Sequence, residues 1–452
     1  MRIALTYIGS GTFSGIPLGL VFLASYVNSR LPEHQVRIVD ANWCDPYSAL
    51  VQGDYDLIGI SSMTSQYERA TKLARNLRNA ATRAPIVLGG VHISTLPSSL
   101  RSPFDLGVIG EGEETFCDLI KHFAEGNTDP DAFATVPGLV YQWYSWGQTP
   151  PRPVITDMDG FPDLDWSLLD PRYWRRQPNR VWQEQAAESL LVTSRGCPYR
   201  CVFCSTTQFW ARYRAHSVPW VIRQIQNLTE LGVTHVQLYD DLFTVHKKRT
   251  REVAEAFRAA GLHKKVKAVS CMARTNLADE ELCDILKSMN VKILSFGFES
   301  GNDRVLRYLK RDTTSVALNQ KAIETCRKHG LRVVGSLMMG SPTETLKEML
   351  DTVRFIRWCV RHGVEDLWPW TSAPYPGTEF WRIGKQRGVV ADDMDFDQCA
   401  MNSKNPGRPL LLEPNISLNA FRAVWFWAQL NLLPCKLRKL ANLARAFMKK
   451  NP

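Results

Sequence analysis

The sequence lacks any uninterrupted apolar run of the ~18 to 20 residues that a membrane-spanning helix needs. The longest apolar-looking stretch, from Ile16 to Val27, is shorter and contains Pro17 and Gly19. The N-terminus has no apolar segment followed by a small-residue cleavage site, so it is typical of a strand and not of a secretory signal. We therefore expect a cytoplasmic location, in which thiols stay reduced.

Paired cysteines and a concentrated block of charge are missing as well. The chain has 11 cysteines, an odd number, and all but three of them are scattered singly. This pattern excludes a disulfide framework and leaves one tight cluster to explain. The net charge of +10 is spread along the chain, with local density only at residues 172–180 and in the C-terminal tail. Nucleic acid is therefore not the expected partner, although an acidic substrate or a membrane surface would be attracted by this charge.

Residues 1–125 alternate short apolar runs with amphipathic segments. The predicted strands are Arg2–Tyr7, Gln35–Asp40, Leu57–Ser61, Pro85–Leu88 and Leu106–Ile109. The predicted helices include Pro17–Ser29, Gln66–Ala81 and Glu114–Phe123. This alternation predicts an α/β domain with a doubly wound, Rossmann-like parallel sheet. Ligands bind such a sheet at the carboxyl ends of its strands, which here are followed by Ser61, Ser62, Gly89, Gly90, Gly110, Glu111 and Gly112.

Residues 126–188 are rich in proline and in interleaved aromatic residues, which predicts an ordered connector without regular helix or central strand. From residue 189 to about 390 the alternation resumes in six strand–helix units, which predicts a partial (β/α)6 barrel. The predicted barrel strands are Leu190–Ser194, His235–Tyr239, Val266–Ser270, Lys292–Phe298, Arg332–Met339 and Asp366–Trp370.

Residues 391–452 form a small helical C-terminal region. It contains the aromatic stretch Phe421–Leu433 and a basic tail that ends with Lys449 and Lys450. We expect this region to cap the barrel. Trp425-Phe426-Trp427 and the basic tail leave peripheral membrane contact or partner binding open.

Three cysteines follow the first predicted barrel strand at intervals of four and three residues: Cys197, Cys201 and Cys204. Thiolates suit an iron–sulfur cluster or zinc. Structural zinc takes four ligands, and His216, the one close candidate, lacks a paired partner at zinc-finger spacing. Three ligands instead leave one iron of a cubane cluster open to a chelating substrate. Gly196 and Pro198 favour a tight loop around such a cluster.

The run Cys197-x3-Cys201-x-Phe203-Cys204 resembles the signature loop of the radical S-adenosylmethionine (SAM) superfamily. The resemblance implies a 4Fe–4S cluster whose open iron chelates the amino and carboxylate groups of SAM. Reductive cleavage of SAM would give a 5′-deoxyadenosyl radical that abstracts hydrogen from an unactivated position. Phe203 is expected to lie near the adenine.

Further motifs end the later strands in the order that this family implies. Tyr239 and Asp240, followed by Asp241, resemble the motif that hydrogen-bonds the SAM amino group, for which a carbonyl or carboxylate acceptor is needed. Glu299 resembles the carboxylate that accepts the ribose hydroxyls, and Met339–Pro342 resembles the adenine-side turn. Arg274 is expected to pair with the SAM carboxylate, with Arg311 as a second candidate.

Residues 1–125 resemble the cobalamin-binding domain that is fused to one large radical SAM group. The matching stretches are Pro17–Leu20, Ile38–Asn42, Ile58–Thr64, Leu88–His92 and Gly110–Glu113. The resemblance implies that the nucleotide tail of cobalamin threads into the sheet and that the seven strand-end residues named above contact the cofactor. The Asp-x-His-x-x-Gly motif of methionine synthase is absent, and we expect His92 to be hydrogen-bonded in a loop and not bound to cobalt.

The leading hypothesis is a cobalamin-dependent radical SAM methyltransferase of class B type. It would act on an unactivated carbon or phosphorus of a small-molecule or lipid-like substrate through methylcobalamin. An external electron donor such as flavodoxin or ferredoxin would reduce the cluster. The alternative is a cyclase or ring-rearranging enzyme that uses both cofactors without methyl transfer.

Two other classes fit the sequence less well. RNA modification of the methylthiotransferase kind needs a second cluster, for which residues 1–125 offer only Cys44 and Cys117. A non-catalytic sensor of corrin or iron would not need the full set of SAM-contact candidates. Cys271, at the end of the third barrel strand, is expected to be a buried small apolar side chain and not a radical-handling group.

Overall fold

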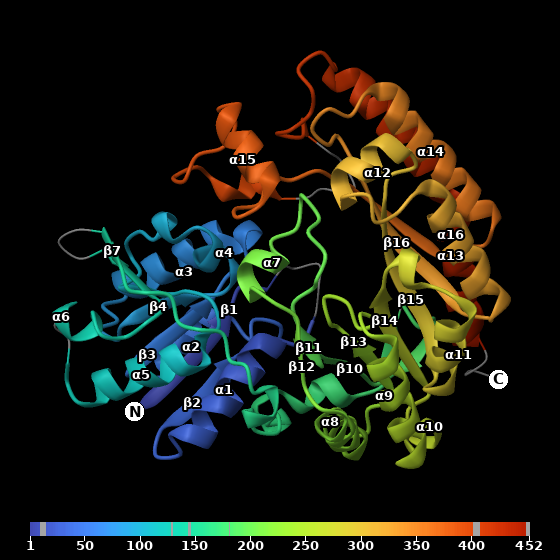
Figure 1. The fold of residues 1–452 in the computed structure, drawn as a ribbon. Helices are drawn as coiled ribbons and strands as arrows, with labels where there is room; N and C mark the ends of the chain where they lie inside the picture. Colours follow the sequence, from blue (N-terminus) through green and yellow to red (C-terminus); the bar gives the residue numbers. More distant parts are fainter. Residues whose placement is uncertain (10–14, 128–129, 143–145, 180, 401–406, 449–452) are drawn as a thin grey trace.

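The computed structural model describes residues 1–9, 15–127, 130–142, 146–179, 181–400 and 407–448, without the side chains of residues 130–131 and 443–448 (Figure 1). Lys449 and Lys450 of the predicted basic tail lie outside this part of the chain. The described residues form two main sheets, each surrounded by helices, and the α/β class predicted from the sequence is confirmed.

The first sheet has the strand order β2–β1–β3–β4–β5–β6–β7. Strands β1 to β5 are parallel, whereas β6 and β7 extend the edge as antiparallel strands. The strands are β1 (Arg2–Tyr7), β2 (Gln35–Val39), β3 (Leu57–Ser61), β4 (Ile86–Gly89), β5 (Leu106–Val108), β6 (Leu139–Gln142) and β7 (Trp146–Gln148). The helical segments are α1 (Leu18–Arg30), α2 (Pro46–Gln52), η1 (Thr64–Gln66), α3 (Tyr67–Asn79), α4 (Val91–Thr95), η2 (Pro97–Ser99), α5 (Gly112–Ala124) and α6 (Pro130–Phe133).

Alternate side chains of β1 enter two different cores. Ile3 and Leu5 pack with residues of α1 and α5 on one face of the sheet, and Ala4 packs with residues of α3 on the other. Because both faces are covered, the parallel strands consist of nearly continuous apolar runs. This burial explains why the five predicted strands agree with the structure to within one residue at each end.

The segment predicted as a connector is ordered, but the expectation that it holds no central strand is wrong. Strand β6 contains no proline and lies between β5 and β7. Beyond β6 and β7 it contains η3 (Met158–Gly160), η4 (Trp166–Leu168), η5 (Pro171–Trp174), β8 (Gln177–Asn179) and β9 (Glu184–Ala186). Its aromatic side chains Trp166, Tyr173 and Trp182 are buried. The apolar area that they bury against neighbouring elements holds the segment in place despite its many prolines.

The second sheet consists of six parallel strands in the order β10–β13–β14–β15–β16–β17, so the predicted partial barrel is confirmed. The strands are β10 (Glu188–Leu191), β13 (His235–Leu238), β14 (Ala268–Ala273), β15 (Val291–Glu299), β16 (Arg332–Met339) and β17 (Asp366–Thr371). A separate antiparallel pair consists of β11 (Ser194–Arg195) and β12 (Arg214–Ala215). The helical segments are α7 (Thr206–Trp210), α8 (Val218–Glu230), α9 (Lys247–Ala259), α10 (Leu262–Lys265), η6 (Thr275–Leu277), α11 (Glu280–Ser288), α12 (Asp303–Lys310), α13 (Val316–Lys328) and α14 (Leu346–Arg361).

The C-terminal region contains α15 (Glu379–Gln386), η7 (Phe396–Cys399) and the long helix α16 (Leu418–Met448). Helix α16 packs against α14 and β17 on the outside of the barrel (Figure 1). Near its start Phe421 approaches Gly340 at the carboxyl end of β16, and further along Lys439 pairs with Asp366 at the start of β17. The helix therefore forms a side wall of the barrel and does not provide the expected cap over one end.

A short piece of the C-terminal region returns to the first domain. The ring of Phe396 in η7 packs edge-on against Tyr67 and His92, with centroid distances of 5.4 and 4.5 Å.

Among the described helices, none is long and apolar enough to cross a membrane.

Candidate active site

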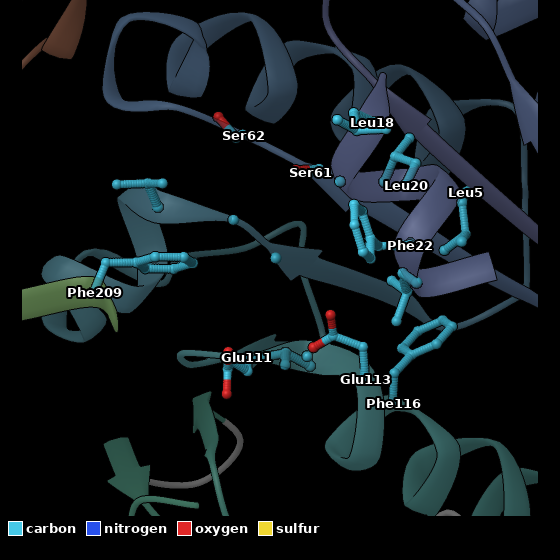
Figure 2. Close-up of a pocket in the computed structure, with 18 of the residues that line it drawn as sticks. Leu5, Leu18, Leu20, Phe22, Ser61, Ser62, Glu111, Glu113, Phe116 and Phe209 are labelled. Atoms are coloured by element: carbon cyan, nitrogen blue, oxygen red, sulfur yellow. The ribbon is translucent and has the colours of Figure 1, made fainter. Parts of the chain in front are cut away.

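A cavity of about 440 Å³ lies between the carboxyl edge of the first sheet and the barrel (Figure 2). All seven strand-end residues predicted from the sequence line it: Ser61, Ser62, Gly89, Gly90, Gly110, Glu111 and Gly112. The barrel side of the cavity includes Leu190, Val192, Trp210 and Tyr239. The structure therefore brings the predicted residues of the first domain together and adds Tyr239 of the second domain to the lining of the same cavity.

Glycines give this cavity room for a large ligand. A Cβ atom placed on Gly89 or Gly110 would meet nothing within 4 Å, because both positions face open space. Gly90 has φ +97°, and a Cβ there would lie 2.6 Å from the carbonyl oxygen of Ser62, so only glycine fits this turn. A ligand can approach the backbone closely at these strand ends.

An apolar slot continues from the strand ends toward α1 and α5 (Figure 2). Figure 2 shows Leu18, Leu20 and Phe22 of α1 lying near Phe116 of α5 and Leu5 of β1. A slot of this kind can receive an extended, largely apolar part of a ligand, while the serines and backbone groups at its mouth offer hydrogen bonds.

The two ends of the cysteine loop are held together by β11 and β12. Between them, Gly196 has φ +87°, and a Cβ there would lie 2.5 Å from the carbonyl oxygen of Arg212. The glycine before Cys197 is therefore required by a close approach of two backbone segments.

Asp240 and Asp241, after β13, also hold this loop. Asp240 is buried and accepts hydrogen bonds from the Thr193 N–H (2.9 Å) and the Ser194 hydroxyl (2.6 Å). Asp241 accepts hydrogen bonds from the Gly196 N–H and the Thr206 hydroxyl, each at 3.1 Å. These contacts attach both carboxylates to the cysteine loop, so the assignment of Asp240 to the SAM amino group stays a prediction.

The three loop cysteines are half-buried free thiols. Burial raises the pKa of Cys197 to about 11 and also raises the pKa of Cys204. The Nη1 group of Arg274 donates to the sulfur of Cys201 at 3.3 Å. In the described part of the chain no group of three histidine, cysteine or acidic side chains converges on a single metal ion. In an iron–sulfur cubane each thiolate binds a different iron atom, so the ligands need not converge in that way.

Buried charges surround the loop on the barrel side. Glu299 has φ +62° and a side chain that is 10% exposed, and its Oε1 lies 3.4 Å from Nζ of Lys310. Lys310 is also buried and donates to the carbonyl oxygen of Gly297. Burial lowers the pKa of Lys310, which the charge of Glu299 opposes. Sequence reasoning missed Lys310, because nothing in the helical pattern of α12 distinguishes it from a surface lysine.

The other predicted SAM-side residues, Phe203, Arg311 and Arg274, each contact a different part of the protein. Phe203 belongs to an apolar cluster that contains Met338 and Phe380, at the carboxyl end of β16. Arg311 pairs with Glu379 and is more than half exposed, so its carboxylate partner is already supplied by the protein. Arg274 stacks at 3.7 Å on the ring of Tyr199 beside the cysteine loop.

Three further expectations concern histidine and cysteine. His92 is fully buried, and its ring nitrogens lie 3.2 Å from the Thr64 hydroxyl and 3.0 Å from the Ser99 hydroxyl. The expected hydrogen bonding is confirmed, but His92 lies on the short helix α4 and not in a loop. His216 stacks on Trp220 at 3.6 Å, and burial lowers its pKa to about 3. Cys271 is buried in the core of the second domain, as expected.

The comparisons with known proteins agree with this geometry. Residues 5–120 match the B12 binding domain family, and residues 191–356 match the Radical SAM superfamily. The chain is 31% identical to an uncharacterised methyltransferase of Pyrococcus horikoshii over 379 residues, which is 81% of this chain and 78% of that protein. It belongs to the radical SAM enzymes that carry a cobalamin-binding domain.

Two other relatives of this radical SAM enzyme span most of its length. The bacteriochlorophyllide d C-8(2)-methyltransferase of Chlorobaculum tepidum is 24% identical over 442 residues, 94% of this chain and 90% of that protein. The structure of the radical SAM methyltransferase TsrM of Kitasatospora setae, with cobalamin and a [4Fe–4S] cluster bound, superimposes with a TM-score of 0.69. It covers 86% of this chain and 75% of its own at 19% identity, so it shows the shared fold.

The residues present fit the cofactors of this family. Cys197, Cys201 and Cys204 are free thiols on one loop and can ligate a 4Fe–4S cluster. The open glycine positions and the apolar slot fit cobalamin bound at the strand ends with its tail between α1 and α5. Glu299, Lys310 and Arg274 are charges of both signs that would suit SAM, which carries an ammonium and a carboxylate.

The carboxylate of Glu111 is paired with arginines, and the contact of this residue with a cofactor stays a prediction. Its oxygens pair with Arg195 at 2.8 Å and with Arg214 at 2.9 Å, and Arg195 also pairs with Glu113 at 2.6 Å. All four side chains are no more than 8% exposed. Burial acts to raise the pKa of Glu111, but the hydrogen bond from Arg214 and the charge of Arg195 outweigh it and hold the pKa below its ordinary value. Because these arginines lie on β11 and β12, Glu111 joins the cobalamin domain to the cluster loop.

We expect Gly89→Val to block cobalamin binding without unfolding the protein. Valine suits a strand end, but its side chain enters the open space of the cavity, so the affinity for hydroxocobalamin should fall at least about tenfold. Spectrophotometric titration of the apoprotein measures this affinity. Gly407→Val is the matched control, because Gly407 also faces open space but lies outside the cavity. Equal affinities in the two variants would contradict the cobalamin assignment.

Glu111→Ala should destabilise the protein by about 3–5 kcal/mol, because it leaves Arg195 and Arg214 buried without their carboxylate. Glu114→Ala is the control: Glu114 pairs with Arg152 but is 43% exposed, so we expect a loss of no more than about 1 kcal/mol. Urea denaturation midpoints compare the two variants. Similar shifts in both would show that the network does not hold the domains together.

The stability of this enzyme should also fall as the pH rises from about 5 to 8. Burial raises the pKa of Glu344 to about 8, and the N–H groups of Gly340 and Ser341 only partly oppose this shift. Between the ordinary pKa of a glutamate and the raised value, the folded state keeps a proton that the unfolded state has released. The free energy of unfolding therefore falls by up to about 1.4 kcal/mol for each pH unit of increase. Glu344→Gln should flatten this dependence in denaturation curves, whereas Glu125→Gln at the surface should not.

Proposed function

We propose that this enzyme is a cobalamin-dependent methyltransferase that acts on an unactivated carbon or phosphorus of a small or lipid-like molecule. The observation that supports it is the shared cavity, which is lined by Gly89 and Gly110 of the cobalamin domain and by Tyr239 of the barrel. A substrate held at this wall lies between the two cofactor sites. The proposal divides the chain into residues 1–125, 126–188, 189–390 and 391–452.

When bound, the cluster and SAM supply a radical and cobalamin supplies a transferable methyl group. The protein contributes positioning and the exclusion of water. Leu190, Val192 and Trp210 make the barrel side of the cavity apolar, which favours an apolar substrate surface. Tyr239, half exposed in the cavity lining, offers a hydroxyl that would orient a polar group of the substrate.

The charges near the cluster loop suit the binding of SAM in the proposed enzyme. Arg274 donates to the sulfur of Cys201, so a carboxylate bound beside the cluster would meet its guanidinium. Glu299 is held in a left-handed backbone conformation, and a Cβ atom at Gly297 would lie 2.2 Å from its Oε1. This fixed carboxylate supports the assignment of Glu299 to the ribose hydroxyls. A small flavin or iron–sulfur protein such as flavodoxin or ferredoxin would supply the electron.

Anaerobic reconstitution with iron, sulfide and hydroxocobalamin tests the cofactor part of the proposal. After desalting, the absorbance spectrum of the wild type should show a cluster and about one cobalamin per chain. The triple variant Cys197→Ala, Cys201→Ala, Cys204→Ala should lose the cluster and keep cobalamin, because the two sites are on different domains. A variant of three buried cysteines outside the loop, Cys271→Ala, Cys283→Ala and Cys359→Ala, is the matched control and should keep the cluster.

Transfer of label from methyl-labelled SAM to candidate substrates separates methylation from the ring-forming alternative. Label in the product supports the methyltransferase. If SAM is cleaved to 5′-deoxyadenosine and the product carries no label, this result would contradict methyl transfer and favour the cyclase.

A further inference from the structure

The outer face of α16 carries an unusual set of exposed apolar side chains. Six large apolar residues of this helix are at least 43% exposed: Phe426, Trp427, Leu430, Leu433, Leu437 and Leu440. Successive intervals of four and three residues place five of them, beginning at Phe426, in one stripe along the helix. A contiguous apolar face of this length on a soluble domain marks an interaction surface.

The opposite face of α16 is fixed to the barrel. Val424, Trp425, Ala428 and Leu432 are buried in the main core of the second domain. Further along, the Cys435 thiol donates to the carbonyl oxygen of Val364 at 3.4 Å. The helix therefore cannot turn its apolar stripe inward without breaking this core.

The charge of α16 limits what can cover the stripe. Residues 418–448 contain no aspartate or glutamate, whereas Arg422, Lys436, Arg438 and Lys439 are basic. Lys439 pairs with Asp366, but Arg422, Lys436 and Arg438 are exposed beside the stripe. Two copies packed α16 against α16 would bring like charges together, without the acidic partners that stabilise paired helices.

We propose that α16 docks this protein onto the surface of an anionic lipid bilayer. The stripe from Phe426 to Leu440 would enter the boundary between headgroups and acyl chains, and the basic residues beside it would meet the lipid charge. The helix lies in the interface and does not cross it, in keeping with its content of charged residues. Figure 1 places α16 on the side of the barrel away from the first sheet, so docking leaves the cavity between the domains uncovered.

Flotation of the reconstituted holoenzyme with vesicles tests this proposal. The vesicles consist of phosphatidylcholine with about one third phosphatidylglycerol, and pure phosphatidylcholine vesicles are the comparison. The wild type should float with the anionic vesicles, and the bound fraction should fall with added salt. The double variant Leu430→Glu, Leu437→Glu should bind at least about tenfold more weakly, because each glutamate removes apolar burial and adds lipid repulsion.

The matched control is Leu231→Glu, Leu318→Glu, which places the same charges at exposed leucines outside α16. This variant should bind vesicles as the wild type does. Equal cluster and cobalamin absorbance in all proteins shows that the variants are folded. Absence of wild-type binding to anionic vesicles, or equal binding by the α16 variant, would overturn the proposal.

Sedimentation equilibrium separates the bilayer from a second copy of this chain. The proposal expects the same oligomeric state for wild type and the α16 variant. A wild-type dimer that becomes monomeric in the α16 variant would show that the stripe binds another copy, and would overturn lipid docking even if the cofactors and methyl transfer are as proposed.

Discussion

The buried carboxylate of Glu111 fixes how the two halves of the enzyme meet. An unpaired charge at a site with 4% exposure would cost several kcal/mol, so this residue is tolerated only with its arginine partners. Arg195 and Arg214 lie on the paired strands β11 and β12, which are the two ends of the cluster loop. One side chain of the cobalamin domain therefore positions the cysteine loop of the other domain.

The acidic side chains around the cysteine loop hold the loop in its conformation. Asp240 and Asp241 accept hydrogen bonds from both the entrance and the exit of the loop. The positive partners lie closer to the sulfurs, with Arg274 at Cys201. A cluster on three thiolates would carry negative charge, and the guanidinium of Arg274 beside the Cys201 sulfur would stabilise it.

Features that depend on local pattern were predictable from the sequence. Strands buried on both faces appear as apolar runs, so β1, β3 and β16 were predicted with their observed bounds. The strand-end glycines and serines were predicted to share one site because parallel strands place their carboxyl ends at one edge. Contacts between distant segments were not predictable in this way. The pairing of Glu111 with Arg195 joins residues 84 positions apart, and the burial of Lys310 beside Glu299 depends on how α12 packs. Neither leaves a periodic signal in the chain.

The return of η7 to the first domain gives the two domains a further contact. The cobalamin domain is joined to the barrel through the Glu111 contacts, and again through Phe396, which packs on Tyr67 and His92. Phe22 of α1 also stacks on Trp220 of α8, and the Ser98 hydroxyl donates to Asp392, so the domains are joined at several separate places. The two walls of the cavity between the domains are therefore held at a fixed separation, and a ligand must fit the space that the folded chain already provides.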